Sequence, residues 1–322
     1  MKSKKLTLYL FVSLVFLSCA SLFIGVVEIN VDELITSPEK LKILILARIP
    51  RLLAIICTGV GMSVAGLIMQ QICKNKFVSP STAATISSAQ LGLLISMIFI
   101  NQKTLLMQTL FAAVFSIIGT CFFIFLIQKF KFKEIMLVPL IGIMFGNIIG
   151  GITNLIAYKY GLTQTLQSWL TGSFSDVIKG RYEIVWLVIP MVIVAFVFAN
   201  YFNIVGMGED FAQNLGINYN VVLFLGLSIC SLITASIVVV VGSISFVGLI
   251  VPNILTMLKG DKIKNNLIDV SLVGALFVLS CDLIARIIIF PYELPIELVI
   301  GIIGTCFFII FLMLKINNKG VK

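Results

Sequence analysis

Residues 206–218 read GMGEDFAQNLGIN and separate two apolar runs, each long enough to cross a lipid bilayer. The segment carries two adjacent acids, Glu209 and Asp210, and contains neither Lys nor Arg. Every other connection that we expect on the same side of the membrane carries at least two Lys. We therefore predict a short helix with a glycine turn that contacts a soluble partner. The alternative is an ordinary solvated loop.

The composition places the whole chain in the membrane. Of its 322 residues, 60% are hydrophobic and only 11% are charged, whereas a soluble domain is about half apolar and about a quarter charged. One transmembrane helix needs about 20 apolar residues, so this length allows roughly ten spans. We expect an all-α, polytopic membrane protein whose residues 1–322 form a single transmembrane domain.

The apolar runs and the charges between them predict the topology. The net charge of +9 comes from lysines clustered between alternate apolar runs, which is an orientation signal rather than a sign of nucleic-acid binding. It predicts a multi-pass membrane protein with both termini in the cytoplasm. A cleaved leader ending near Cys19 is an alternative for the first run. The expected spans cover about residues 6–27, 48–72, 82–100, 105–128, 135–157, 184–202, 221–241, 245–258, 267–289 and 296–314.

Several kinds of chemistry have no sequence signal here. There is no phosphate-binding loop of the G-x-x-x-x-G-K-[ST] type and no His, which excludes a Ser–His or Cys–His nucleophile. The seven Cys lie mostly in apolar runs without a C-x-x-C pair, so we expect no disulfide framework. We predict no catalytic residue, no metal site and no cofactor. Since the chain has neither an energy motif nor a proton relay, we expect its motion to be driven by a partner.

Three groups of residues within the spans draw attention. Asp282 and Arg286 are four apart and can form an ion pair on one helix face, although Asp282 could instead couple an ion gradient to transport. Arg48 and Arg51 are three apart and share a face at the outer end of the second span. In the fifth span, three glycines recur at four-residue steps and permit close helix packing. Two asparagines of the same span either form hydrogen bonds to other helices or line an aqueous path. These residues are Gly142, Gly146 and Gly150, with Asn147 and Asn154.

Six motifs follow one another over nearly the whole chain. They are RIPRLLA from Arg48, NKFVSPSTAATIS from Asn75, WLTGS from Trp169, GEDFAQNLGIN from Gly208, GSISFVGLIVPN from Gly242 and DLIARIIIFPYELPIELVIGIIGTCFF from Asp282. This ordered set resembles the permease subunits of iron–siderophore, haem and cobalamin ABC importers, the FecCD type. The resemblance implies a location in the bacterial cytoplasmic membrane and a cobalamin-importer-like permease fold of ten spans. It also implies a second permease that is identical or homologous, two cytoplasmic ATPases and an extracytoplasmic binding protein.

The resemblance also implies roles for particular residues. The loop after the sixth span would contact the ATPase, and spans five and ten would lie near the translocation path between two permeases. The outer arginines Arg48, Arg51 and Arg286 would receive acids of the binding protein, the alternative being interfacial anchoring or pairing with Asp282. The ATPase-coupling residues would be Gly208, Glu209, Asp210, Ala212, Leu215 and Gly216.

Two positions depart from the family pattern, one of which bears on the cargo and the other on the inner contact. The turn after the second span reads NKFVSP instead of N-P-L-A-x-P, and Asn253 stands where a His often follows the proline. The NKFVSP form is similar to the branch that carries iron bound to catecholate or mixed siderophores, such as petrobactin or anguibactin. The resemblance thus implies import of a ferric siderophore. The alternatives are cobalamin or haem import by the same mechanism, an ion-coupled secondary transporter, or a membrane-embedded enzyme.

Overall fold

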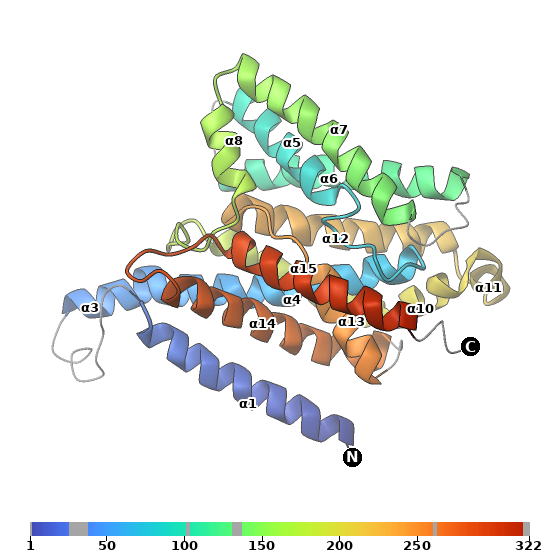
Figure 1. The fold of residues 1–322 in the computed structure, drawn as a ribbon. Helices are drawn as coiled ribbons and strands as arrows, with labels where there is room; N and C mark the ends of the chain where they lie inside the picture. Colours follow the sequence, from blue (N-terminus) through green and yellow to red (C-terminus); the bar gives the residue numbers. More distant parts are fainter. Residues whose placement is uncertain (1, 26–37, 101–103, 131–136, 260–262, 318–322) are drawn as a thin grey trace.

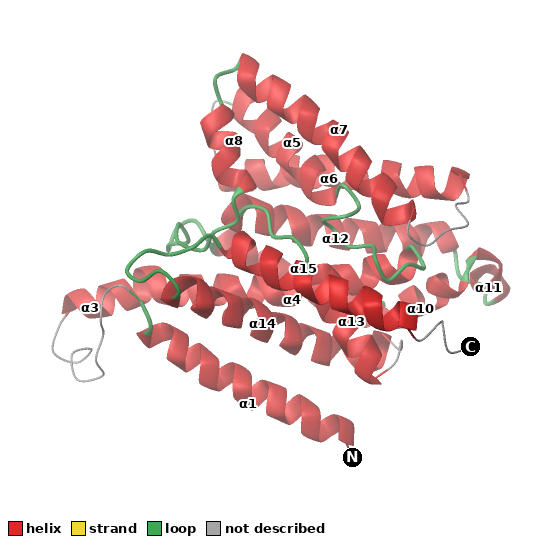
Figure 2. Ribbon diagram, viewed as in Figure 1, coloured by secondary structure: helices red, strands yellow, loops and turns green. Residues whose placement is uncertain are grey.

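The computed structural model describes residues 2–25, 38–100, 104–130, 137–259 and 263–317, which form helices joined by loops and turns and contain no strand (Figures 1 and 2). In chain order the elements are α1 (Lys2–Phe23), α3 (Pro38–Ile43), the π-helical turn η1 (Leu44–Arg48), α4 (Ile49–Ile72), α5 (Thr85–Phe99), α6 (Leu105–Phe130), α7 (Leu137–Lys159), α8 (Thr163–Leu170), the 3-10 turn η2 (Glu183–Leu187), α9 (Val188–Val197), α10 (Ala199–Met207), α11 (Glu209–Asn214), α12 (Tyr219–Val241), α13 (Val247–Lys259), α14 (Ile263–Ile287) and α15 (Ile296–Asn317).

The apolar helices fall on the ten segments predicted from the sequence. In the described part of the chain, six helical stretches are long and apolar enough to span a membrane. A bent pair, Glu183–Val197 with Ala199–Met207, forms a further candidate with a 60° bend, and α5, α13 and Ile296–Ile310 are shorter apolar helices. The prediction of an all-α, polytopic protein is confirmed. The acids at 26–37 and the lysines after Asn317, which contributed to the predicted orientation, lie outside the described residues.

Helix α4 lies at the centre of the bundle, where it contacts α9, α10, α12, α13 and α14. Two glycine pairs let the helix backbones meet. A Cβ built on Gly66 would lie 1.9 Å from the carbonyl oxygen of Gly248 in α13, and a Cβ on Gly59 would lie 2.4 Å from that of Gly274 in α14. Small residues at such crossings allow the backbone approach on which helix packing in a bilayer depends.

The helices α5, α6 and α7 form a group that joins the rest of the bundle through α12 (Figure 1). Helix α15 packs on α13 and α14. A cavity of about 520 Å³ is lined by residues of both α15 and α7. This α7–α15 cavity is lined mainly by apolar side chains, together with four hydroxyls. Its lining residues are Phe77, Ser81, Thr82, Pro139, Leu140, Ile143, Ser245, Phe246, Leu249, Thr305 and Phe308.

A break at residues 242–246 separates α12 from α13. The 13 residues of α13 span about 20 Å at 1.5 Å per residue, less than the ~30 Å hydrocarbon core. Pro252 has no N–H, so the carbonyl of Gly248 is left open within α13 and accepts from Nε2 of Gln70 at 3.3 Å. The Nδ2 of Asn253 donates to Lys76 O at 2.8 Å, which ties the turn after α4 to α13. Asn253 thus has a structural contact at the position where the family often has His.

Helix α1 lies at the edge of the bundle and contacts α14 and α4 (Figure 1). Most of its side chains are not buried in the chain; Leu14 and Leu17 pack on the core, and polar contacts lie near both ends of the helix. The hydroxyl of Thr7 donates to Oδ1 of Asp269 at 2.7 Å, and Asp269 also forms an ion pair with Lys259. Near the other end, backbone carbonyls of α1 accept hydrogen bonds from two arginines, as described below.

Candidate coupling and docking sites

The segment at residues 206–218 forms a short helix, α11, followed by a glycine turn, as the sequence predicted. Gly208 precedes α11 with φ +132° and Gly216 follows it with φ +73°, a backbone region that L side chains rarely adopt. Ala212 is fully buried and anchors α11, while Leu215 is 55% exposed. Glu209 and Asp210 are both exposed, and they lie in the first turn, where acids are favoured by the helix dipole.

Apolar side chains beside these acids complete a mixed surface, which we call the α11 surface. Met207 is 66% and Phe211 46% exposed, and neither was among the predicted site residues. Phe211 and Leu215 are four apart, a spacing that points to one helix face and could have identified Phe211. Exposed apolar residues beside charges are typical of protein interaction sites.

The α11 surface is connected to the centre of the bundle through the end of α4. A Cβ built on Gly206 would lie 3.0 Å from Oε1 of Gln71, and a Cβ on Gly208 would lie 3.0 Å from Nζ of Lys74. Helix α10, which leads into α11, also contacts α4 and α12. Helix α10 and Gly208 therefore link α11 to the end of α4.

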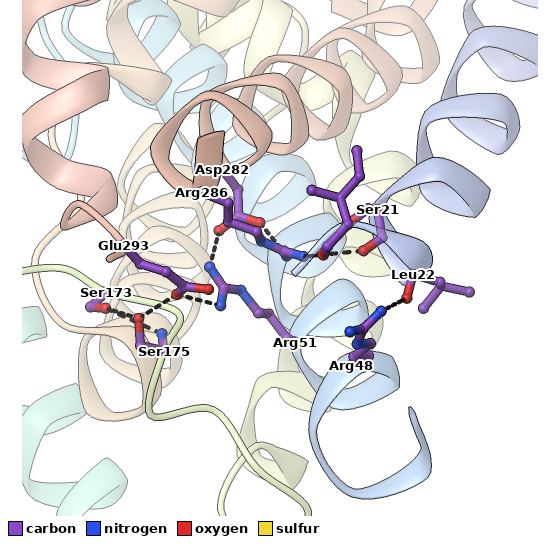
Figure 3. A network of polar contacts seen from close by, with 10 residues as sticks. Ser21, Leu22, Arg48, Arg51, Ser173, Ser175, Asp282, Arg286 and Glu293 are labelled. Atoms are coloured by element: carbon purple, nitrogen blue, oxygen red, sulfur yellow. Dashed lines mark hydrogen bonds and ion pairs between the residues drawn. The ribbon is translucent and has the colours of Figure 1, made fainter. Parts of the chain in front are cut away.

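At the opposite end of the bundle, two of the predicted arginines, Arg51 and Arg286, converge on two acids (Figure 3). Asp282, 1% exposed, forms the expected i,i+4 ion pair with Arg286 and a second ion pair with NH2 of Arg51 at 2.8 Å. The NH1 of Arg51 binds Oε2 of Glu293 at 2.7 Å. Arg51 therefore points into the bundle, although the sequence suggested that it could reach the membrane surface. A buried charge left without its partner is strongly destabilising, which explains why each of these groups is paired.

Arg48 and Arg286 make three further contacts with backbone at the end of α1. Arg48 donates to the carbonyl of Leu22, and NH1 of Arg286 donates to the carbonyls of Ser21 and Ile24, both at 3.1 Å. These carbonyls lie at the C-terminal end of α1, where helix oxygens lack partners within the helix and attract cations. The three arginines and Glu293 line a cavity of about 180 Å³, which we call the arginine cup.

Glu293 was expected only as part of an outer turn, yet it connects three elements. It lies between α14 and α15 and also accepts from the hydroxyl of Ser175 at 2.9 Å. Burial alone would raise the pKa of its carboxyl, but the charge of Arg51 and hydrogen bonds from Arg51 and Ser175 outweigh burial and lower that pKa. The ion pair with Arg51 therefore persists at any pH above the ordinary carboxyl pKa of about 4.3. It is lost as the pH falls through the lowered pKa of Glu293.

The predicted glycines of α7 lie in unlike surroundings. A Cβ on Gly142 would lie 1.9 Å from the carbonyl oxygen of Thr82, and one on Gly146 would lie 3.3 Å from Oγ of Ser87, whereas nothing lies within 4 Å of such a Cβ on Gly150. The side chain of Asn147 is exposed on the surface of the chain. The three glycines are therefore not equivalent: the first two lie against α5 and the turn before it, and the third faces open space.

This difference predicts opposite outcomes for two equal substitutions in α7. Gly142→Leu should lower the melting temperature of the detergent-solubilised chain by several degrees, because overpacking costs about 1–3 kcal/mol. Gly150→Leu should leave that temperature within about a degree, since surface substitutions stay within about 0.5 kcal/mol. Thermal unfolding followed by size-exclusion chromatography measures both. Equal destabilisation by the two changes would contradict the described packing.

Two further observations limit the chemistry. Among the described residues, no group of three or more His, Cys, Asp or Glu is placed to hold a metal ion. All seven cysteines are free; Cys230 and Cys281 are buried, and Cys19 and Cys306 are exposed on the chain surface. Among the described residues, charged groups are paired in the arginine cup and between Lys259 and Asp269.

Comparison with known proteins covers nearly the whole chain. It is 46% identical over 306 residues to the petrobactin import system permease protein YclN of Bacillus subtilis, covering 95% of this chain and 97% of the relative. It is 40% identical over 309 residues to the ferric-anguibactin transport system permease protein FatD of Vibrio anguillarum, covering 95% and 97%. These relatives match the siderophore branch that the NKFVSP turn indicated.

A solved structure shows the same architecture. It is an inward-facing conformation of a putative metal-chelate type ABC transporter, with a TM-score of 0.80 and 25% sequence identity over 96% of this chain and 99% of that one. The model of the FecCD transport family matches residues 13–315. The chain is therefore a multi-pass membrane protein that belongs to the FecCD transport family.

Proposed function

We propose that this chain is the permease subunit of an ABC importer that moves a ferric siderophore across the bacterial cytoplasmic membrane. The observation that carries the proposal is the 46% identity to a petrobactin permease over 95% of the chain. The exposed acids and apolar side chains of the α11 surface support it, because they offer a site for an ATPase subunit. In this proposal the end of the bundle with α11 and both termini faces the cytoplasm, and the arginine cup faces outward.

The proposed cycle assigns no covalent chemistry to this chain. A loaded binding protein presents acids to the arginine cup, and charge complementarity steers the encounter. The chelate enters between this chain and a second permease, beside α7 and α15. ATP-driven closure of the ATPases then displaces α11, and the displacement reaches α4 through Gln71 and Lys74.

Reconstitution tests this function directly. Proteoliposomes holding this chain, its second permease and the ATPases, supplied with binding protein, should take up ⁵⁵Fe-labelled ferric petrobactin or anguibactin only when ATP is inside. ATPases with an inactivated phosphate-binding loop are the control. Uptake by this chain alone, driven by an ion gradient without ATP, would contradict the proposal and indicate a secondary transporter. ATP-driven uptake of cobalamin or haem in place of both siderophores would retain the mechanism and overturn the cargo.

A further inference from the structure

The arginine cup already holds one acid of its own chain. We propose that Glu293 occupies the place of a partner carboxylate, and that docking of an acidic protein surface exchanges one carboxylate for the other on Arg51. The inference rests on the proposed docking function and assigns to Glu293 a role that docking alone does not require.

The charges paired around Arg51 are balanced. Two guanidinium groups, those of Arg51 and Arg286, meet two carboxylates, those of Asp282 and Glu293, so a further acid at Arg51 would be in excess unless one of these carboxylates left. The buried Nε of Arg51 has no hydrogen-bond partner in the described part of the chain, so its donors are not all used. The cavity of about 180 Å³ is several times the ~30 Å³ share of one liquid water, which is enough for the end of an acidic side chain.

The two acids that bind Arg51 differ in how easily they can leave. The side chain of Asp282 is 1% exposed and is held by two arginines. That of Glu293 is 21% exposed and is held by one arginine and one serine. Glu293 also lies on a connection between helices, whereas Asp282 lies within α14. Asp282 is therefore the fixed counter-ion, and Glu293 is the acid that can move into water when another carboxylate replaces it.

Exchange is favoured over simple addition by electrostatics. A carboxylate that approached NH1 of Arg51 with Glu293 still bound would lie beside a like charge, which is unfavourable at an interface. If Glu293 moves out as the partner acid moves in, the charge balance of the cup is preserved and neither Arg51 nor Asp282 is left unpaired.

Release of Glu293 would be transmitted to α15. The segment containing Gly172 and Ser175 is fastened to the start of α15 by two acids: Ser175 donates to Glu293, and the N–H of Gly172 donates to Glu297 at 3.2 Å. If the contact between Ser175 and Glu293 is lost, Glu297 is the remaining carboxylate that joins this segment to α15. Helix α15 lines the α7–α15 cavity, so docking at the cup would loosen a helix beside the proposed path.

Binding measurements on the reconstituted importer in nanodiscs test the exchange. Glu293→Gln keeps the shape of the side chain and removes the competing charge, so it should tighten binding of the loaded binding protein by about tenfold, equal to 1.4 kcal/mol. Glu293→Asp keeps the charge, so its affinity for the binding protein should stay nearer to that of the wild type. Asp176→Asn is the matched control: it removes one exposed acid beside Ser175 that does not line the cup, and its effect should stay below about twofold.

A double-mutant cycle separates this inference from the docking proposal. Arg51→Gln should weaken binding, and in that background Glu293→Gln should have no further effect, because Glu293 acts through Arg51. Unchanged or weaker binding by Glu293→Gln, with Arg51 still required, would overturn the exchange alone. Binding that does not depend on Arg51 would overturn the docking role itself. If Glu293→Gln does not assemble, Glu293→Asp decides: weaker binding than wild type overturns the exchange, and equal or tighter binding supports it.

Discussion

Replacing both Glu209 and Asp210 by Lys should abolish ATP-driven uptake of the ferric siderophore while the chain remains folded in the membrane. Both side chains are exposed on α11, so the change alters the charge of a surface rather than the packing of a core. It converts two negative charges into two positive ones in the first turn of a helix, where cations are also unfavourable. Like-charge contacts at an interface cost several kcal/mol, so uptake should fall by more than about a hundredfold.

Cellular uptake of ⁵⁵Fe-siderophore and co-purification of the ATPase subunit measure the effect. The neutral double variant, Glu209→Gln with Asp210→Asn, is the matched control and should retain more uptake than the charge-reversed one. Asp176→Lys makes the same reversal at the other end of the bundle and should leave ATPase co-purification intact. Normal uptake together with normal ATPase association in the Lys variant would remove the α11 surface from the coupling mechanism.

Gly66→Leu should prevent the chain from accumulating in a folded form. A Cβ on Gly66 would lie 1.9 Å from the carbonyl oxygen of Gly248 and 2.4 Å from its Cα, so the clash is with backbone that cannot rotate away. Relief would require α13 to move away from α4, the central helix. We expect a loss of more than about 3 kcal/mol, beyond ordinary overpacking, seen as loss of the monodisperse peak in fluorescence-detected size-exclusion chromatography.

Gly151→Leu is the matched control, because nothing lies within 4 Å of a Cβ built at Gly151. It adds the same side chain to an apolar helix of the same protein, so a general effect of leucine on insertion would appear in both variants. A folded Gly66→Leu chain with wild-type thermal stability would show that α4 and α13 are not in backbone contact.

The sequence predicted the number and order of the apolar helices, because each is a long apolar run bounded by polar residues. It did not predict α8, which lies in a stretch that we expected to be an outer connection. Leu166 and Leu170 are four apart there, and Leu166 is buried against Leu94 and Ala157. An apolar pair on so short a segment does not distinguish a packed helix from a loop. The 60° bend after Val197 was also missed, since no Pro or Gly marks that position.

In the candidate sites too, contacts between residues close in sequence were predictable, and contacts between distant residues were not. Local spacing was sufficient for the Asp282–Arg286 pair and for the short helix α11. It could not place Arg51 beside Asp282 and Glu293, from which it is 231 and 242 residues distant in the chain. Such contacts depend on how α4 and α14 cross, and a single sequence carries no periodic signal for a crossing.

Arg48 and Arg286 bind the end of α1 through backbone carbonyl oxygens, which every amino acid carries. Because the guanidinium groups bind the main chain at Ser21, Leu22 and Ile24, the identities of those residues contribute nothing to the bonds. The sequence of this first helix can therefore change freely, provided that it stays apolar and ends at the same depth in the membrane. A chimaera carrying an unrelated lipid-facing helix of equal length, with Thr7 retained, would keep its attachment.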